Sequence, residues 1–222
     1  MLVISFITHK GGAGKTTLAS SMAVAAQEAG EKVALLDLDP QGATLSWAET
    51  RGHIDPFVFS TAPHELSLRI EELHYAGYTL CVLDTSADLA GCELAIDASD
   101  LCIVPSRPNT FDLRAGAITW RKIQLQGKAG AFLLNQCPPM RQSARNQEAS
   151  RALQESGALL SPMISARVDF QDAARAGLGV TEINSSGQAA REVRELWTSI
   201  LAYGQTSATA AEAFVEEVLE AA

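Results

Sequence analysis

A glycine-rich stretch near the N-terminus, HKGGAGKTT from His9 to Thr17, constrains the fold more than any other feature of this sequence. It follows an apolar run, Leu2–Thr8, and it precedes a helix-like pattern that begins at Lys15. Glycines between a strand and a helix let backbone N–H groups converge on an anion, which the helix N-terminus also attracts. The stretch therefore predicts a phosphate-binding loop of the G-x-x-x-x-G-K-[ST] kind, with His9 at the position of its first glycine.

The chemistry of such a loop assigns a role to its residues. Lys15 is expected to reach the β- and γ-phosphates of a nucleotide, and the Thr16 hydroxyl is expected to ligate Mg²⁺. A glycine-rich turn without a ligand is the alternative, but the glycines, the Gly-Lys-Thr end and the flanking elements all agree with phosphate binding. The predicted nucleotide contacts in the loop are Gly11, Gly12, Ala13, Gly14, Lys15, Thr16 and Thr17.

Strand-like and helix-like segments alternate along the chain. Strands are expected at Leu2–Thr8, Lys32–Asp37, Phe57–Phe59, Thr79–Asp84, Leu101–Pro105, Gly130–Asn135 and Leu159–Ile164. Helices are expected at Lys15–Ala29, Pro63–Ala76, Cys92–Ala98, Asp112–Gln126, Gln142–Ser156, Asp169–Ala176, Gln188–Tyr203 and Thr209–Ala222. Continuously apolar strands are typical of parallel sheets covered on both faces. The pattern predicts a doubly wound α/β fold with a mostly parallel sheet of about seven strands and helices on both faces.

Length and composition suit one soluble domain. The 222 residues include 47% hydrophobic and 19% charged residues, which is the balance of a globular protein. We expect a single domain over residues 1–222, with a helical part from about residue 165. No apolar run reaches the roughly 18 residues of a membrane span, and the N-terminal LVISFIT lacks the basic region of a signal peptide. A cytoplasmic location is therefore expected.

Two strands are expected to end in carboxylates at the edge of the sheet that carries the phosphate loop. Asp37 and Asp39 in LLDLDPQG are two residues apart, so they share one side of an extended chain, and Asp84 ends the run CVLD. Such acids suit the hydration of Mg²⁺ and the positioning of an attacking water, and Asp84 is expected to hold Mg²⁺ through water. The alternative for Asp37 is that it only caps the segment that follows it.

The segment K-G-G-x-G-K-T-T from Lys10 to Thr17 resembles the deviant Walker A loop of the ParA/MinD family of ATPases, and D-P-Q-G from Asp39 resembles the switch I motif of ParA proteins. The resemblance implies ATP and Mg²⁺ as cofactors and a homodimer in the ATP state. It implies that Lys10 reaches the partner's phosphates, as an arginine finger supplied in trans would. It also implies that Asp39 orients the attacking water and that Asp37 supports the metal shell.

The same resemblance implies further contacts, and it has departures. It places Asn135 and the segment from Pro105 to Pro108 near the adenine, with ordinary loop prolines and a capping Asn as the alternative. Where the family often has D-T-P-P, this chain has the four residues from Asp84 to Ala87, DTSA, which leaves the coupling of switch II in question. The proposed catalytic set is Lys10, Lys15 and Asp39.

Three branches of the family compete. The D-P-Q-G motif favours a ParA-type partition or cargo-positioning ATPase on the nucleoid, stimulated by a ParB-like DNA-binding partner. A MinD-type membrane-cycling ATPase needs a basic amphipathic C-terminal helix, whereas residues from Gln205 to Ala222 include four Glu and no Lys or Arg, so we expect no membrane partner. A metal-cluster carrier or metabolic ATPase is the third reading. The cysteines, Cys81, Cys92, Cys102 and Cys137, form no C-x-x-C pair, although spacing alone leaves a cluster shared between subunits open.

Binding to DNA without sequence preference has to overcome a formal net charge of −9. Resemblance to ParA proteins, in which late-chain basic residues line the DNA face of the dimer, points to Arg167, Arg175, Arg191 and Arg194. The alternative is that these arginines pair with the acids beside them, Asp169, Asp172, Glu192 and Glu195.

Overall fold

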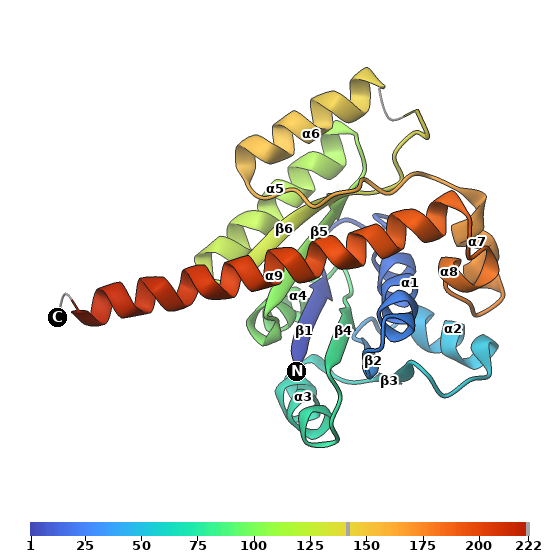
Figure 1. Cartoon of the computed structure of the whole chain (residues 1–222), viewed down its shortest axis with the longest axis horizontal. Coiled ribbons are helices and arrows are strands. Elements are labelled where there is room, and N and C mark those ends of the chain that lie inside the picture. Colours follow the sequence, from blue (N-terminus) through green and yellow to red (C-terminus); the bar gives the residue numbers. More distant parts are fainter. Residues whose placement is uncertain (141–142, 221–222) are drawn as a thin grey trace.

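A parallel sheet forms the centre of the molecule (Figure 1). The computed structural model describes residues 1–140 and 143–220, and the side chains among them except those of 89–90 and 206–220. The strands are β1 (Leu2–Phe6), β2 (Val33–Asp37), β3 (Phe57–Ser60), β4 (Leu80–Asp84), β5 (Leu101–Ser106) and β6 (Ala129–Leu134). Their order across the sheet is β3-β2-β4-β1-β5-β6, and every pairing is parallel. All carboxyl ends therefore meet at one edge.

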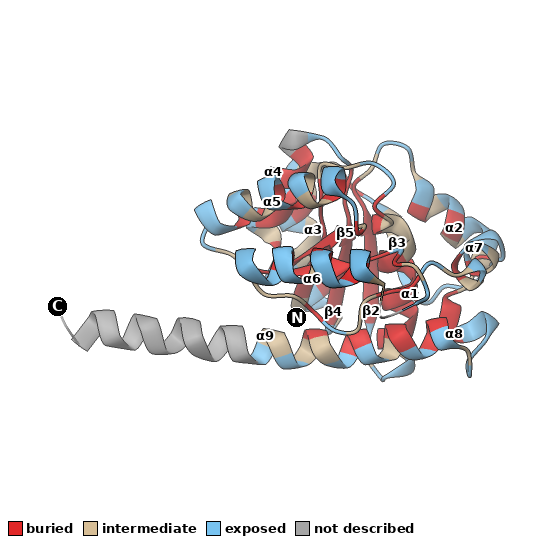
Figure 2. Ribbon diagram, turned by 90° about the horizontal axis from the view of Figure 1, so that it is seen from above, coloured by how far each residue is buried: buried red, intermediate tan, exposed pale blue. Residues whose placement is uncertain are grey.

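Helices cover both faces of the sheet, as the buried sides of the ribbons show (Figure 2). One face packs against α1 (Lys15–Glu28), α2 (Ala43–Arg51), α7 (Val168–Arg175), α8 (Val180–Ile183) and α9 (Gln188–Glu220). The other packs against α3 (Leu66–Tyr75), α4 (Leu89–Ala98), α5 (Thr110–Leu125) and α6 (Ala144–Ser156), and the short 3₁₀ helix η1 (Pro63–Glu65) leads into α3. The doubly wound α/β fold is confirmed.

Alternation of side chains along each strand builds the two cores. In β2, Val33 and Leu35 belong to the core under α1 and α9, whereas Ala34 and Leu36 belong to the core under α3 and α4. Because both faces are covered, the strand is apolar at every position until Asp37, the first residue at the carboxyl edge.

The structure corrects two predicted elements. The seventh strand, expected at Leu159–Ile164, forms only an isolated bridge between Leu159 and Phe132, because Pro162 has no N–H to continue a ladder. The two helices expected at the C-terminus are one, α9, since the sequence around Gly204 contains no proline to end the first.

Two helices were not expected from the sequence, the short α8 and the longer α2. It begins after Gly42, which adopts a left-handed conformation with φ 65°, and it ends at Gly52, whose φ is also 65°. Trp47 is buried, and its indole N–H donates to the Leu178 carbonyl at 3.1 Å, which ties α2 to the segment before α8. Gly52 is the C-terminal glycine signal that could have revealed this helix.

Candidate functional site

The glycine-rich loop lies at the carboxyl end of β1, next to the ends of β4 and β5. Gly12 and Gly14 have φ of 76° and 91°, a conformation in which a side chain is strained. Gly14 also has no room for one, because a Cβ there would lie 2.4 Å from the Asn135 amide nitrogen. Gly14 caps α1 without a side-chain hydrogen bond, so the first-turn N–H groups remain available to an anion.

Lys15 begins α1 and is almost enclosed, with 9% of its surface exposed. Its ammonium donates to the Thr8 carbonyl at 3.3 Å, a contact that keeps the side chain folded over the loop. A buried ammonium needs a compensating charge. The phosphates of a nucleotide would supply it, in agreement with the role predicted for Lys15.

Asp84 lies at the end of β4, opposite Asp37 in the register of the neighbouring strand. Its Oδ2 accepts a hydrogen bond from the Thr44 hydroxyl at 2.7 Å, whereas its buried Oδ1 has no partner among the described residues. Burial raises the pKa of Asp84 to about 6, and the neighbouring hydroxyls of Thr44 and Thr16 oppose this shift. A nearby cation would favour the charged form. The free oxygen and the Thr16 hydroxyl thus fit a Mg²⁺ ion held directly or through water.

Asp37 has another set of partners. Its Oδ2 accepts hydrogen bonds from the backbone N–H groups of Thr44 and Leu45 at 3.0 and 3.1 Å. Its Oδ1 accepts a hydrogen bond from the backbone N–H of Asp39 at 3.0 Å. It therefore caps α2 and shapes the Asp39 turn, as the capping alternative expected. A contribution of Asp37 to the metal shell stays a prediction.

Asp39 is half-buried at the turn that leads into α2. Its Oδ1 accepts from the Gln41 N–H at 3.0 Å, a local turn contact that leaves the other oxygen without a partner among the described residues. Asp39 thus presents a carboxylate oxygen at the same edge of the sheet as Asp84. This position suits a group that orients water.

Two side chains that follow β6 hold the loop from the opposite side. The Asn135 amide donates to the Ala13 carbonyl at 2.8 Å, and the Gln136 amide donates to the Gly12 carbonyl at 3.1 Å. Gln136 has φ 51°, an uncommon value for a residue with a side chain. The sequence did not single out Gln136. Its neighbour Asn135, which was predicted to lie near the adenine, was the only sequence feature that pointed to this segment.

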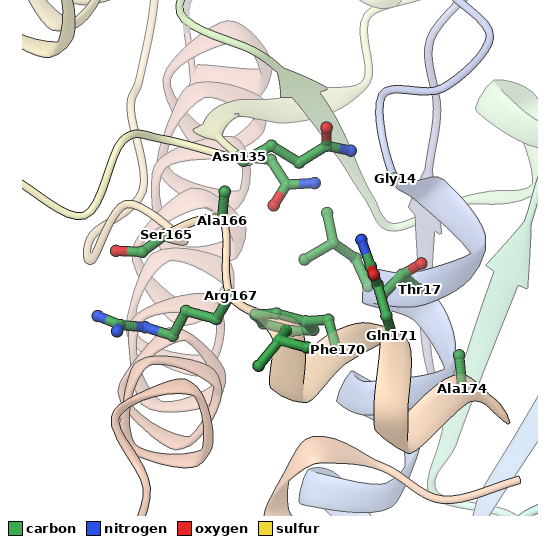
Figure 3. Close-up of a pocket in the computed structure, with 12 residues that line it drawn as sticks. Gly14, Thr17, Asn135, Ser165, Ala166, Arg167, Phe170, Gln171 and Ala174 are labelled. Atoms are coloured by element: carbon green, nitrogen blue, oxygen red, sulfur yellow. The ribbon is translucent and has the colours of Figure 1, made fainter. Parts of the chain in front are cut away.

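A cavity of about 540 Å³ opens beside Gly14 and Thr17 (Figure 3). Asn135 faces it from the residue after β6, while Ala166, Phe170 and Gln171 line it from the segment that enters and forms α7. Amide groups opposite an aromatic ring suit a flat heteroaromatic base. The structure brings Asn135 to this cavity. Pro105 lies inside β5 and Pro108 lines a groove between α5 and α6, so their contact with a base stays a prediction.

The two residues that open the loop differ in their surroundings. Lys10 is half-buried, and its side chain makes no ion pair within the described part of the chain. Both ring nitrogens of His9 are buried without a hydrogen-bond partner among the described residues. Burial is the main cause that lowers the pKa of His9, and the nearby Lys122 and Lys15 act in the same direction. Of these two residues, Lys10 is therefore the one with a cationic side chain, and that side chain has no ion pair among the described residues.

The arginines assigned to DNA do not form one free patch. Arg167 points away from the cavity (Figure 3) and pairs with Glu192 at 3.1 Å, and Arg175 pairs with Asp172 at 2.9 Å. Arg194 pairs with Glu28 of α1 at 3.0 Å rather than with an acid beside it. Only Arg191 among the four is exposed without an ion pair in the described residues.

Other classes of site find little support. All four cysteines are buried as free thiols, and no cluster of three or more His, Cys, Asp or Glu side chains among the described residues could hold a metal ion. No helix in the described part of the chain is both long and apolar enough to cross a membrane.

A comparison with protein families identifies the family to which this fold and this loop belong. The model of the CobQ/CobB/MinD/ParA nucleotide-binding domain matches residues 4–213. The chain belongs to this family, which confirms the resemblance read from the loop.

Two relatives and two solved structures illustrate the range of the family. The chain is 36% identical over 159 residues to the maintenance of carboxysome distribution protein A of Gloeobacter kilaueensis, covering 70% of this chain and 72% of that protein. It is 32% identical over 101 residues to a probable plasmid-partitioning protein ParA of Thermus thermophilus, covering 42% of this chain and 29% of that protein. Both matches fall within the family that includes MinD and ParA.

The solved structures share the fold at low sequence identity. Apo McdA of Cyanothece has a TM-score of 0.76 at 16% identity, covering 90% of this chain and 99% of that chain. The septum site-determining protein MinD of Pyrococcus horikoshii, solved with Mg-ADP, has a TM-score of 0.70 at 18% identity, covering 90% of this chain and 95% of that chain. These structures agree with the doubly wound sheet described above.

Proposed function

We propose that this protein is a Mg²⁺-dependent ATPase that dimerises when it binds ATP and acts as a positioning switch on the nucleoid, with hydrolysis stimulated by a partner protein. The observation that carries the proposal is the phosphate loop itself. It contains an enclosed lysine, Lys15, and a second lysine, Lys10, that has no ion pair within the described part of the chain. At the end of the neighbouring strand β4, the buried Asp84 carboxylate has one oxygen without a hydrogen-bond partner among the described residues.

The residues divide the chemistry among them. The loop N–H groups and Lys15 bind the phosphates, and the amides of Asn135 and Gln136 keep the loop in shape. Thr16 and Asp84 would hold Mg²⁺, which when bound neutralises phosphate charge. Asp39 positions the attacking water, and Lys10 places positive charge on the phosphates bound by the partner subunit.

The cargo is proposed from the relatives. The matches to proteins named for carboxysome distribution and for plasmid partitioning favour the positioning of a protein or DNA cargo. A ParB-like or other small DNA-binding protein would then be the activator. A membrane-cycling role has no specific observation in its favour, and a metal-cluster carrier lacks an accessible cysteine pair, since the four thiols are buried.

Binding to random duplex DNA tests this proposal. We expect fluorescence anisotropy to detect binding with ATP but not with ADP, because dimerisation doubles a weak basic face. Each phosphate contact should add about −0.9 to the slope of log affinity against log salt concentration. Arg175 and Arg191 are the exposed candidates, since Arg175 keeps only a surface pair of little strength.

The double variant Arg175→Glu/Arg191→Glu should lose this binding. The matched control is Arg114→Glu/Arg121→Glu, which reverses two exposed arginines on α5. Equal loss in both variants would mean that net charge alone governs the interaction. No binding by the wild type with any nucleotide would remove the nucleoid from the proposal and leave a protein cargo or a membrane.

A further inference from the structure

Arg107 follows β5 and is held in one orientation by α5. Its Nη2 donates to Asp112 Oδ1 at 3.1 Å, and its Nε donates to Asp112 Oδ2. The Asp112 side chain is only 2% exposed, and its backbone N–H is bound by the Asn109 cap at 3.0 Å. A bidentate pair with a fixed carboxylate leaves the guanidinium little freedom to turn.

The remaining nitrogen of this guanidinium lies over the phosphate loop. Arg107 Nη1 is 4.0 Å from the position that a Cβ on Gly12 would occupy, and no other atom outside the neighbouring residues lies within 4 Å of that position. Nη1 has no hydrogen-bond partner among the described residues, whereas Nε and Nη2 are both engaged. The arginine therefore presents a free NH₂ group at the apex of the loop.

A purely structural role for Arg107 explains this arrangement poorly. The loop is already held by Asn135 and Gln136, whose amides bind the carbonyls of Ala13 and Gly12. Arg107 makes no hydrogen bond to the loop within the described residues, and its side chain is still 33% exposed. Its ion pair orients the guanidinium without using the group that faces Gly12.

We propose that Arg107 is a further phosphate-contacting residue of this site, whose free Nη1 binds the γ-phosphate in the ATP-bound state. This inference rests on the proposed function. Loop N–H groups surround the inner phosphates, and Lys15 reaches the β- and γ-phosphates. The charge that distinguishes ATP from ADP lies on the γ-phosphate, where Arg107 would be a second cation from the same chain beside Lys15. A planar guanidinium preset by Asp112 can meet it without a further loss of side-chain freedom.

Titration calorimetry with ADP and with a non-hydrolysable ATP analogue tests the inference. Arg107→Gln should weaken binding of the analogue by about tenfold or more, as expected for a lost hydrogen bond to a charged group, and leave ADP binding unchanged. Arg107→Lys should recover part of the affinity because it keeps the charge. Arg114→Gln, at an exposed arginine of α5 without an ion pair in the described residues, is the matched control and should bind both nucleotides normally.

A second variant guards against a folding defect, since Arg107→Gln leaves Asp112 buried beside an uncharged partner. Arg107→Gln/Asp112→Asn removes both charges and keeps two side chains that can hydrogen-bond to each other. The same selective loss of analogue binding in this variant supports the inference. An equal loss for ADP and the analogue, or no loss at all, would overturn it. A wild type that binds neither nucleotide would instead overturn the proposed function.

Discussion

Mg-ATP is expected to raise the melting temperature of the wild-type chain and to leave that of Lys15→Ala unchanged. A ligand at a hundred times its dissociation constant stabilises the folded state by about 2.7 kcal/mol. For a domain of this size, such a gain corresponds to roughly 5–10 °C. Among the described residues, the Lys15 side chain makes one hydrogen bond, to the Thr8 carbonyl, so its removal should affect nucleotide binding far more than the fold.

Differential scanning fluorimetry with and without Mg-ATP measures this effect. Lys32→Ala is the matched control, because Lys32 contacts the Ala76 carbonyl and the Tyr78 ring, at the start of β4 rather than at its carboxyl end. The control should keep the full shift in melting temperature. Equal shifts for the wild type and Lys15→Ala would remove the phosphate-loop interpretation.

Asp39→Ala should bind ATP and dimerise but hydrolyse it about 10²–10⁴-fold more slowly, the range expected when a positioned acid–base group is lost. Among the described residues, the half-buried Asp39 carboxylate makes only a turn contact with Gln41, so the fold should tolerate the change. Phosphate release under single-turnover conditions measures the rate, and melting temperature with Mg-ATP confirms binding.

Glu49→Ala provides the comparison for Asp39→Ala, because it removes an exposed carboxylate from the last turn of α2. It should hydrolyse ATP at the wild-type rate. If Asp39→Ala also does so, the water-positioning role moves to another acid, with Asp84 and then Asp37 as candidates. If Asp39→Ala fails to bind ATP, its role is in the binding site and not in the chemical step.

The sheet and the phosphate loop could be predicted because their signals are local. An apolar strand, three glycines and Gly-Lys-Thr lie within one short stretch, and the acid at the end of β4 follows directly from its strand pattern. Since parallel strands share a carboxyl edge, strand positions alone bring Asp84 to the loop.

The rest of the site could not be predicted, because it depends on contacts between distant segments that no local sequence pattern indicates. The Gln136 side chain hydrogen-bonds to the Gly12 carbonyl, 124 positions earlier in the chain. Its backbone has a positive φ, a conformation that the sequence does not predict for this residue. The cavity beside Gly14 is lined by Phe170 and Gln171, in a segment where the sequence drew attention only to charged residues such as Arg167 and Arg175. The position of Asp37 predicts a metal ligand. Its carboxylate, however, accepts hydrogen bonds from backbone N–H groups of α2, a helix that the sequence did not predict.

The central claim, an ATP-dependent dimer completed by Lys10, is tested most directly by the molar mass in solution. Multi-angle light scattering with a non-hydrolysable ATP analogue should give twice the chain mass of 23.6 kDa for the wild type. Lys10→Ala should bind the analogue, because the rest of its loop is intact, yet remain at the mass of one chain. A Lys10→Ala variant that dimerises like the wild type, or a wild type that stays monomeric with the analogue, would contradict the account.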